Sequence, residues 1–158
     1  MKIGITGHQR LKNSSDWTKV QIRLTGLLDK AEKPLIGLTS LAIGADQMFA
    51  EAVLQCGGTI EAIIPFYGYE MKFNEGPDRE AFQRLLEQAS RIETLEKQGT
   101  DEEAFLAAGK RIADVCDNMI AVWDGQPAAG IGGTGDIVNY CNSYGKPVEL
   151  IGVDVSSR

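Results

Sequence analysis

Short apolar segments alternate with longer amphipathic segments along the whole sequence. The apolar segments have the length and composition of buried strands, and they cover residues 2–6, 35–39, 60–64, 92–95, 119–123 and 146–151. Between them, apolar residues recur every three or four positions, as Val20, Leu24 and Leu28 do, which is typical of helices packed on one face. This alternation predicts a parallel sheet covered by helices on both faces, because parallel strands need a crossover between them.

The order of the segments also predicts the architecture. With right-handed crossovers, we expect a mainly parallel sheet of strand order 4-3-2-1-5-6 in a three-layer, Rossmann-like α/β sandwich. The chain has 158 residues and shows no linker, internal repeat or low-complexity tract. Residues 1–158 are therefore expected to form one domain with a single core.

A glycine-rich stretch from Gly130 to Asp136 separates the apolar segment Met119–Trp123 from a predicted helix that contains Ile137. Such a turn leaves backbone N–H groups free at the helix N-terminus, where they suit an anion such as phosphate. Glycine allows the backbone to approach a ligand closely and to adopt positive φ. The stretch predicts an anion site, and the alternative is a flexible strand-to-helix loop without a ligand.

The predicted strand order reverses direction between the first and fifth strands. Ligands of open α/β sheets bind outside the carboxyl ends of the strands at such a point. The loops that leave the strands there are rich in polar residues and glycine. We therefore take as candidate ligand-binding residues Gly7, His8, Arg10, Ser40, Gly44, Asp46, Asp124, Gly125, Gly132, Gly133, Thr134, Gly135 and Asp136.

Four of these candidates have a titratable or charged side chain that allows more than one interpretation. The guanidinium of Arg10 suits bidentate phosphate binding, although Arg10 and His8 could instead cap a helix or pair with a local carboxylate. Asp46 stands at a predicted helix start, where it could cap the helix or meet a sugar hydroxyl. Asp124 follows a buried strand and could either hold the glycine loop or accept a hydrogen bond from a sugar hydroxyl.

Composition narrows the classes of partner. The formal net charge of −6 at neutral pH works against binding to nucleic-acid backbones. His8 is the sole histidine and the three cysteines show no CxxC spacing, so we expect no metal site and reduced thiols. We recognise neither a signal peptide nor an apolar run of membrane-spanning length. These features favour a cytoplasmic protein that does not contact membranes.

Five short motifs at predicted strand ends resemble those of a known group of proteins. They are ITGHQR at 5–10, SLAIGAD at 40–46, PF at 65–66, AVWDG at 121–125 and GGTGDIV at 132–138. In this order they are similar to the SLOG superfamily of Rossmann-like proteins, named for DNA-processing protein A and the Lonely Guy cytokinin-activating enzymes. Small bacterial members with a GGT-G-D glycine loop look most alike. The resemblance extends from Ile3 to about Ile151 and implies a nucleotide-derived ligand whose phosphate lies in the glycine loop.

The Lonely Guy enzymes share a glycine-loop pattern, PGGxGTxxE, which this chain matches in part. The glycines of that pattern correspond to Gly132, Gly133 and Gly135. Ile131 stands at the proline position, Asp136 at the threonine and Asn139 at the catalytic glutamate. Cleavage of an N-glycosidic bond needs a carboxylate near the ribose, so an enzyme of this type would have to use Asp136 or Asp46 instead.

Three functions follow from the sequence and the resemblance, in this order of preference. The first is a sensor or carrier module that binds a nucleotide or nucleotide-like small molecule and needs no further cofactor. The second is a nucleotide phosphoribohydrolase or related N-glycosidase. The third, a DNA-binding protein like DNA-processing protein A, is disfavoured by the acidic charge balance. The relatives also suggest a homodimer.

Overall fold

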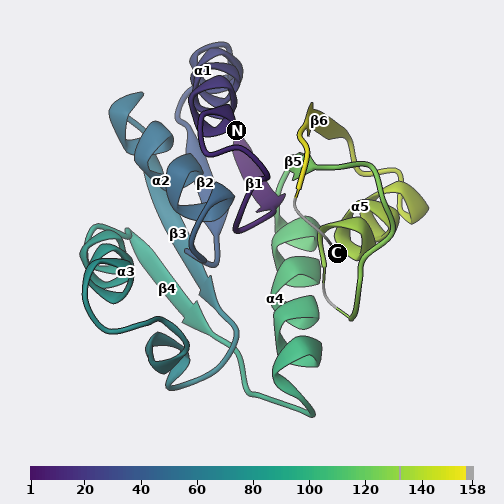
Figure 1. The fold of residues 1–158 in the computed structure, drawn as a ribbon. Coiled ribbons are helices and arrows are strands. Elements are labelled where there is room, and N and C mark those ends of the chain that lie inside the picture. Colours follow the sequence, from purple (N-terminus) through teal and green to yellow (C-terminus); the bar gives the residue numbers. More distant parts are fainter. Residues whose placement is uncertain (132, 156–158) are drawn as a thin grey trace.

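The computed structural model describes residues 1–131 and 133–155. In these residues strands and helices alternate around one sheet (Figure 1). The elements are β1 (Lys2–Gly7), α1 (Asp16–Asp29), β2 (Ile36–Thr39), α2 (Ala45–Gln55), β3 (Thr59–Ile64), the 3₁₀ helix η1 (Tyr69–Lys72), α3 (Pro77–Glu87), β4 (Arg91–Thr94), α4 (Asp101–Val115), β5 (Asn118–Trp123), α5 (Thr134–Ser143) and β6 (Val148–Gly152).

The sheet confirms the predicted topology. Its strand order is β4-β3-β2-β1-β5-β6 and neighbouring strands pair in parallel. From β1 to β4 the chain moves in one direction, so right-handed crossovers place α1, α2 and α3 on one face. It then returns to the other side of β1, and the reversed direction places α4 and α5 on the opposite face (Figure 1).

Each face of the sheet has its own apolar layer. Val20, Leu24 and Leu28 of α1 recur at helical spacing and are fully buried against the first face, as the pattern predicts. On the second face, Ile112 of α4 and Ile137 of α5 belong to a separate buried cluster. Because the two layers cover both faces, the central strands β1, β2, β3 and β5 are protected from solvent along most of their length, whereas the edge strands β4 and β6 are more exposed.

Glycines within the strands let two helices lie close to the sheet. A Cβ atom on Gly4 of β1 would lie 2.5 Å from Ile112 Cγ2 on α4. A Cβ on Gly37 of β2 would lie 2.8 Å from Val53 Cγ2 and 3.0 Å from Phe49 Cε1, both on α2. Helix α4 is therefore seated tightly over β1, on the face where the candidate site opens.

The main local difference from the sequence prediction lies in the segment between β3 and α3. The polar and aromatic residues there do not form a wholly irregular loop, because the segment contains the short helix η1. Tyr69 is buried there and packs edge-on against Phe66, Phe73 and Phe82 at centroid distances of 5.2–5.8 Å. This aromatic packing orders the segment. No helix in the described part of the chain is both long and apolar enough to cross a membrane.

Candidate ligand-binding site

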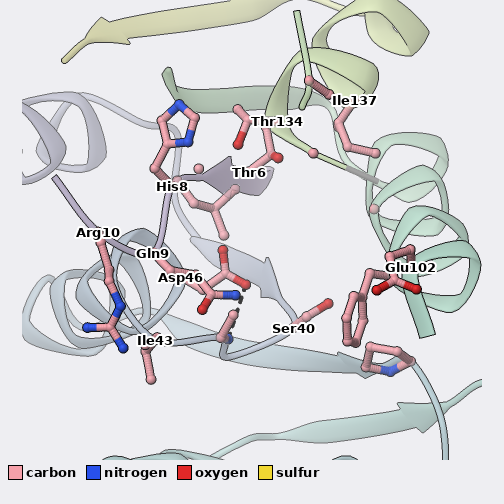
Figure 2. Close-up of a pocket in the computed structure, with 18 of the residues that line it drawn as sticks. Thr6, His8, Gln9, Arg10, Ser40, Ile43, Asp46, Glu102, Thr134 and Ile137 are labelled. Atoms are coloured by element: carbon pink, nitrogen blue, oxygen red, sulfur yellow. Dashed lines mark hydrogen bonds between the residues drawn. The ribbon is translucent and has the colours of Figure 1, made fainter. Parts of the chain in front are cut away.

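A cavity of about 880 Å³ opens at the carboxyl end of the sheet, between the loops that follow the strands and the helices α4 and α5 (Figure 2). Its walls combine the end of β1, the loops after β2, β3 and β5, the first turn of α5 and one side of α4. This is the edge at which the strand order reverses. The volume is in the range of small-molecule sites.

The cavity brings together most of the residues that the sequence singles out. The candidates that line it are Gly7, His8, Arg10, Ser40, Asp46, Gly133, Thr134 and Gly135. The candidates that do not line it are Gly44, Asp124, Gly125 and Asp136. Gly132 lies outside the described residues. Two residues of the second group, Gly44 and Asp124, instead make contacts within the loops that form the cavity.

Gly44 fixes the start of α2 against the loop that follows β1. It is the N-cap residue of α2 and has a φ of 85°, which glycine adopts without strain. A Cβ there would lie 2.5 Å from the carbonyl oxygen of Gln9. The next residue, Ala45, donates its N–H to the carbonyl of His8 at 3.2 Å. Gly44 therefore joins two loops that form the cavity rather than facing a ligand.

The loop after β2 is held rigidly where it meets the cavity. Leu41 is fully buried with a φ of 58°, an uncommon conformation for a residue with a side chain. Its N–H donates to Thr39 Oγ1 at 3.0 Å, and its carbonyl accepts from Gln47 Nε2 at 3.1 Å. These contacts present Ser40 and Ile43 to the cavity from a fixed backbone (Figure 2).

Asp46 is a buried carboxylic acid in the cavity wall. It is the second residue of α2, and Oδ2 accepts the N–H of Ala42 at 3.3 Å, upstream of the helix. The alternative in which Asp46 caps α2 is wrong, because Gly44 occupies the N-cap position. Burial raises the pKa of Asp46 from 3.8 to about 7, against hydrogen bonds from Ala42, Ser40 and Thr39 that lower it. Near neutral pH the group can therefore give up or take up a proton.

His8 and Asp124 link the end of β1 to the start of the glycine loop. The backbone N–H of Asp124 donates to His8 Nε2 at 3.2 Å, while Asp124 Oδ1 lies 3.4 Å from the same nitrogen. Asp124 Oδ1 also accepts the N–H of Gln126 at 3.0 Å. These contacts support the interpretation in which Asp124 holds the loop.

Gly133 and Gly135, at the start of α5, pack against the loop that precedes this helix. Gly133 has an ordinary φ of −72°, so it needs no positive-φ conformation. A Cβ on Gly133 would lie 2.8 Å from Ala128 Cβ, and one on Gly135 would lie 2.9 Å from the backbone nitrogen of Ala128. Ala128 therefore occupies at least part of the space that a side chain at position 133 or 135 would need. This close packing brings the first turn of α5, with Thr134, to the cavity.

The charged side chains around the cavity are unevenly arranged. Arg10 is exposed and forms no salt bridge with any residue that the structure describes. Lys72 is paired with Asp101, which also binds Lys97. Figure 2 shows Arg10 and Glu102 on opposite sides of the cavity. Arg10 is thus the cation on the wall that remains available to an anionic ligand.

Sequence reasoning missed the contribution of α4. Glu102, Phe105 and Gly109 line the cavity from this helix, although only loops after strands were expected to do so. A signal was present, because Thr100 and Glu103 have capping-box spacing and the N–H of Glu103 donates to Thr100 Oγ1 at 3.2 Å. A helix that begins directly after the edge strand must place its first turn at the carboxyl end of the sheet.

Within residues 1–131 and 133–155, no three His, Cys, Asp or Glu side chains are grouped so that they could hold a metal ion. The polar groups of the cavity's described lining include hydroxyls, carboxylates, the imidazole of His8, the side-chain amides of Gln9 and Asn74, the ammonium of Lys72 and the guanidinium of Arg10. This set suits an organic ligand that carries an anionic group and hydroxyls.

Comparison with known proteins shows the same fold in solved structures. No protein-family model matches the sequence, and no curated protein matches it. The X-ray structure of DNA processing protein A from Streptococcus pneumoniae matches with a TM-score of 0.68 and 18% identity, over 98% of this chain and 51% of that chain. This chain has the fold of DNA processing protein A. The two chains share a Rossmann-like α/β fold.

Two further structures agree with this assignment. DNA processing protein A from Helicobacter pylori, for which a single-stranded DNA binding mode is described, matches with a TM-score of 0.65 and 19% identity, over 98% of this chain and 68% of that chain. The protein TM1055 matches with a TM-score of 0.58 and 19% identity, over 93% of this chain and 71% of that chain. This chain spans about half the length of the pneumococcal protein. The three matches show one shared fold.

Proposed function

We propose that this protein binds a nucleotide or nucleotide-derived metabolite in the cavity, as a sensor or carrier. The observation that carries the proposal is that the first turn of α5 and Arg10 line the same cavity. The first N–H groups of a helix have no acceptor within the helix, and the helix dipole favours an anion beside them. A phosphate at Thr134 and Gly135 would accept these N–H groups, and Arg10 would neutralise its charge.

The remainder of the cavity favours a nucleotide over a bare anion. About 880 Å³ is far more than a phosphate fills. Ser40 and Asp46 offer hydrogen-bonding groups to sugar hydroxyls from the rigid loop after β2 and the start of α2. Phe105 lines the wall farther along α4 and provides an aromatic surface for a base. One cavity therefore contains groups that would suit a phosphate, a sugar and a base.

Titration calorimetry with nucleoside monophosphates, the matching nucleosides and inorganic phosphate tests the proposal. We expect monophosphates to bind and Arg10→Gln to weaken them at least tenfold, with much less effect on nucleosides. Arg91→Gln is the matched control, because Arg91 is exposed on β4 outside the cavity. Equal losses for nucleotides and nucleosides would assign Arg10 to loop structure. Absence of nucleotide binding would refute the proposed function.

A second candidate function is hydrolysis of the N-glycosidic bond, and the burial of Asp46 is the observation that favours it. A carboxyl whose pKa is about 7 can serve as a general acid or base at neutral pH. Incubation with nucleotides and chromatography for free base tests this candidate. We expect Asp46→Asn to abolish any release of base while nucleotide binding persists. Release that survives in this variant would exclude Asp46 as the catalytic carboxylate.

The fold neighbours also make single-stranded DNA a useful competitor in these titrations. The net charge of −6 and the carboxylates of Asp78 and Glu102 on the cavity wall oppose a phosphate backbone. We therefore expect an oligonucleotide to bind more weakly than a mononucleotide. Tight binding that falls steeply with salt would favour the DNA-binding function instead.

A further inference from the structure

The cavity extends along α4 well beyond the first turn of α5. Its α4 wall runs from Asp101 to Ile112, and the eleven steps between these residues span about 16 Å at the helical rise of 1.5 Å per residue. Helix α5 meets this wall at Gly109, where an added Cβ would lie 2.4 Å from Ile137 Cδ1. The part of the cavity near residues 102–105 is therefore one to two helical turns along α4 from this contact with α5.

Phe105 forms a fixed aromatic surface in this distal part. Its ring stacks on Phe66 at a centroid distance of 5.9 Å and an interplanar angle of 29°, and it meets Tyr69 at 6.1 Å. Pro65 lines the cavity beside it. A ring held by two other rings is already positioned before a ligand binds. This surface suits a flat ring system such as a nucleobase.

Glu102 provides a carboxylate beside this surface. It lies three residues before Phe105 and so on the same side of α4. Whereas Asp101 is neutralised by Lys72 and Lys97, Glu102 forms no salt bridge with any described residue. Figure 2 shows it across the cavity from Arg10. In this distal part, the carboxylate of Glu102 therefore offers two oxygens that can accept hydrogen bonds from a ligand.

We propose that the cavity selects guanine nucleotides, with the base against Phe105 and its Watson–Crick edge on Glu102. The inference rests on the proposed nucleotide-binding function. Guanine presents a ring N–H and an exocyclic amino group side by side, and the two carboxylate oxygens can accept both. Adenine and cytosine place an acceptor nitrogen beside the amino group, and uracil places carbonyls beside its N–H. Those edges meet a carboxylate with at least one repulsive contact.

Dissociation constants for GMP, IMP, AMP and UMP with the full chain test this inference. We expect GMP to bind at least tenfold more tightly than AMP or UMP, and IMP, which lacks the amino group, to lie between them. Glu102→Gln should reduce the preference for GMP over AMP to less than about threefold, because the amide replaces one of the two acceptor oxygens by an NH2 donor, which would face one of the two adjacent N–H donors of guanine. Glu87→Gln, at an exposed position on α3 outside the cavity, should leave the preference unchanged.

The outcomes separate this inference from the function on which it rests. If all four nucleotides bind with similar affinity, guanine selection is wrong and nucleotide binding stands. If the preference for GMP survives in Glu102→Gln, the assignment to Glu102 is overturned. If no nucleotide binds, both proposals fall. Phe105→Leu gives an independent readout, because loss of the aromatic surface should weaken all four nucleotides while the dependence on phosphate persists.

Discussion

Asp46 gives the sharpest physical prediction, because burial raises the pH at which its carboxyl group ionises. The unfolded chain releases this proton near the ordinary pKa of 3.8, whereas the folded protein retains it until about pH 7. Between these values the folded state binds more protons than the unfolded state. The free energy of unfolding must therefore fall as pH rises through this window, and it levels off above pH 7.

The size of this effect follows from the change in pKa. A rise from 3.8 to about 7 corresponds to about 4 kcal/mol, at roughly 1.4 kcal/mol for each pH unit. About 3 kcal/mol of this falls between pH 5 and pH 8, because the unfolded carboxyl is already mostly ionised at pH 5. This is a large part of the total stability of a typical domain.

Urea denaturation of the wild type and Asp46→Asn at pH 5 and pH 8 measures the effect. All other titrating groups are shared, so the difference between the two proteins isolates Asp46. We expect the wild type to lose about 3 kcal/mol relative to the variant between pH 5 and pH 8. Parallel pH profiles would refute the reasoning, because they would mean that the folded carboxyl ionises at its ordinary pKa.

Two further substitutions test the local architecture of the site. Thr100→Ala removes the hydroxyl that caps α4 and should lower the free energy of unfolding in urea by about 1 kcal/mol, whereas an unchanged midpoint would mean that the cap contributes little. Gly133→Ala should impair nucleotide binding, because its Cβ would meet Ala128 Cβ at 2.8 Å, and adding Ala128→Gly should restore affinity in calorimetry. If the double variant stays defective, the ligand itself requires glycine at 133.

The strand order and both apolar layers were predictable because each rests on a periodic signal. The buried face of α1 is predicted by the spacing of Val20, Leu24 and Leu28 alone. The strands are apolar enough to be recognised as buried, and right-handed crossovers then leave little choice of topology. The location of the cavity follows from the same argument, since the carboxyl ends of parallel strands share one edge.

The roles of individual site residues were less predictable, because they depend on contacts between distant segments. Nothing in the sequence near Gly44 shows that Gln9 would lie against it, or that Gly133 would pack on Ala128. Asp46 has the position of a capping residue, yet it bonds backward to Ala42 because the strained loop at Leu41 turns that N–H toward it. From its spacing alone, Phe105 is indistinguishable from the core residues of α4. Its position on the cavity wall depends on how α4 crosses the sheet.

The central claim is that one cavity binds the phosphate of a nucleotide between the first turn of α5 and Arg10. Calorimetric titration of GMP and guanosine into the wild type and Arg10→Gln tests it most directly. We expect GMP to bind the wild type at least tenfold more tightly than guanosine, and this advantage to shrink severalfold in Arg10→Gln. Equal affinity of the wild type for GMP and guanosine would contradict the claim, because the phosphate would then make no favourable contact.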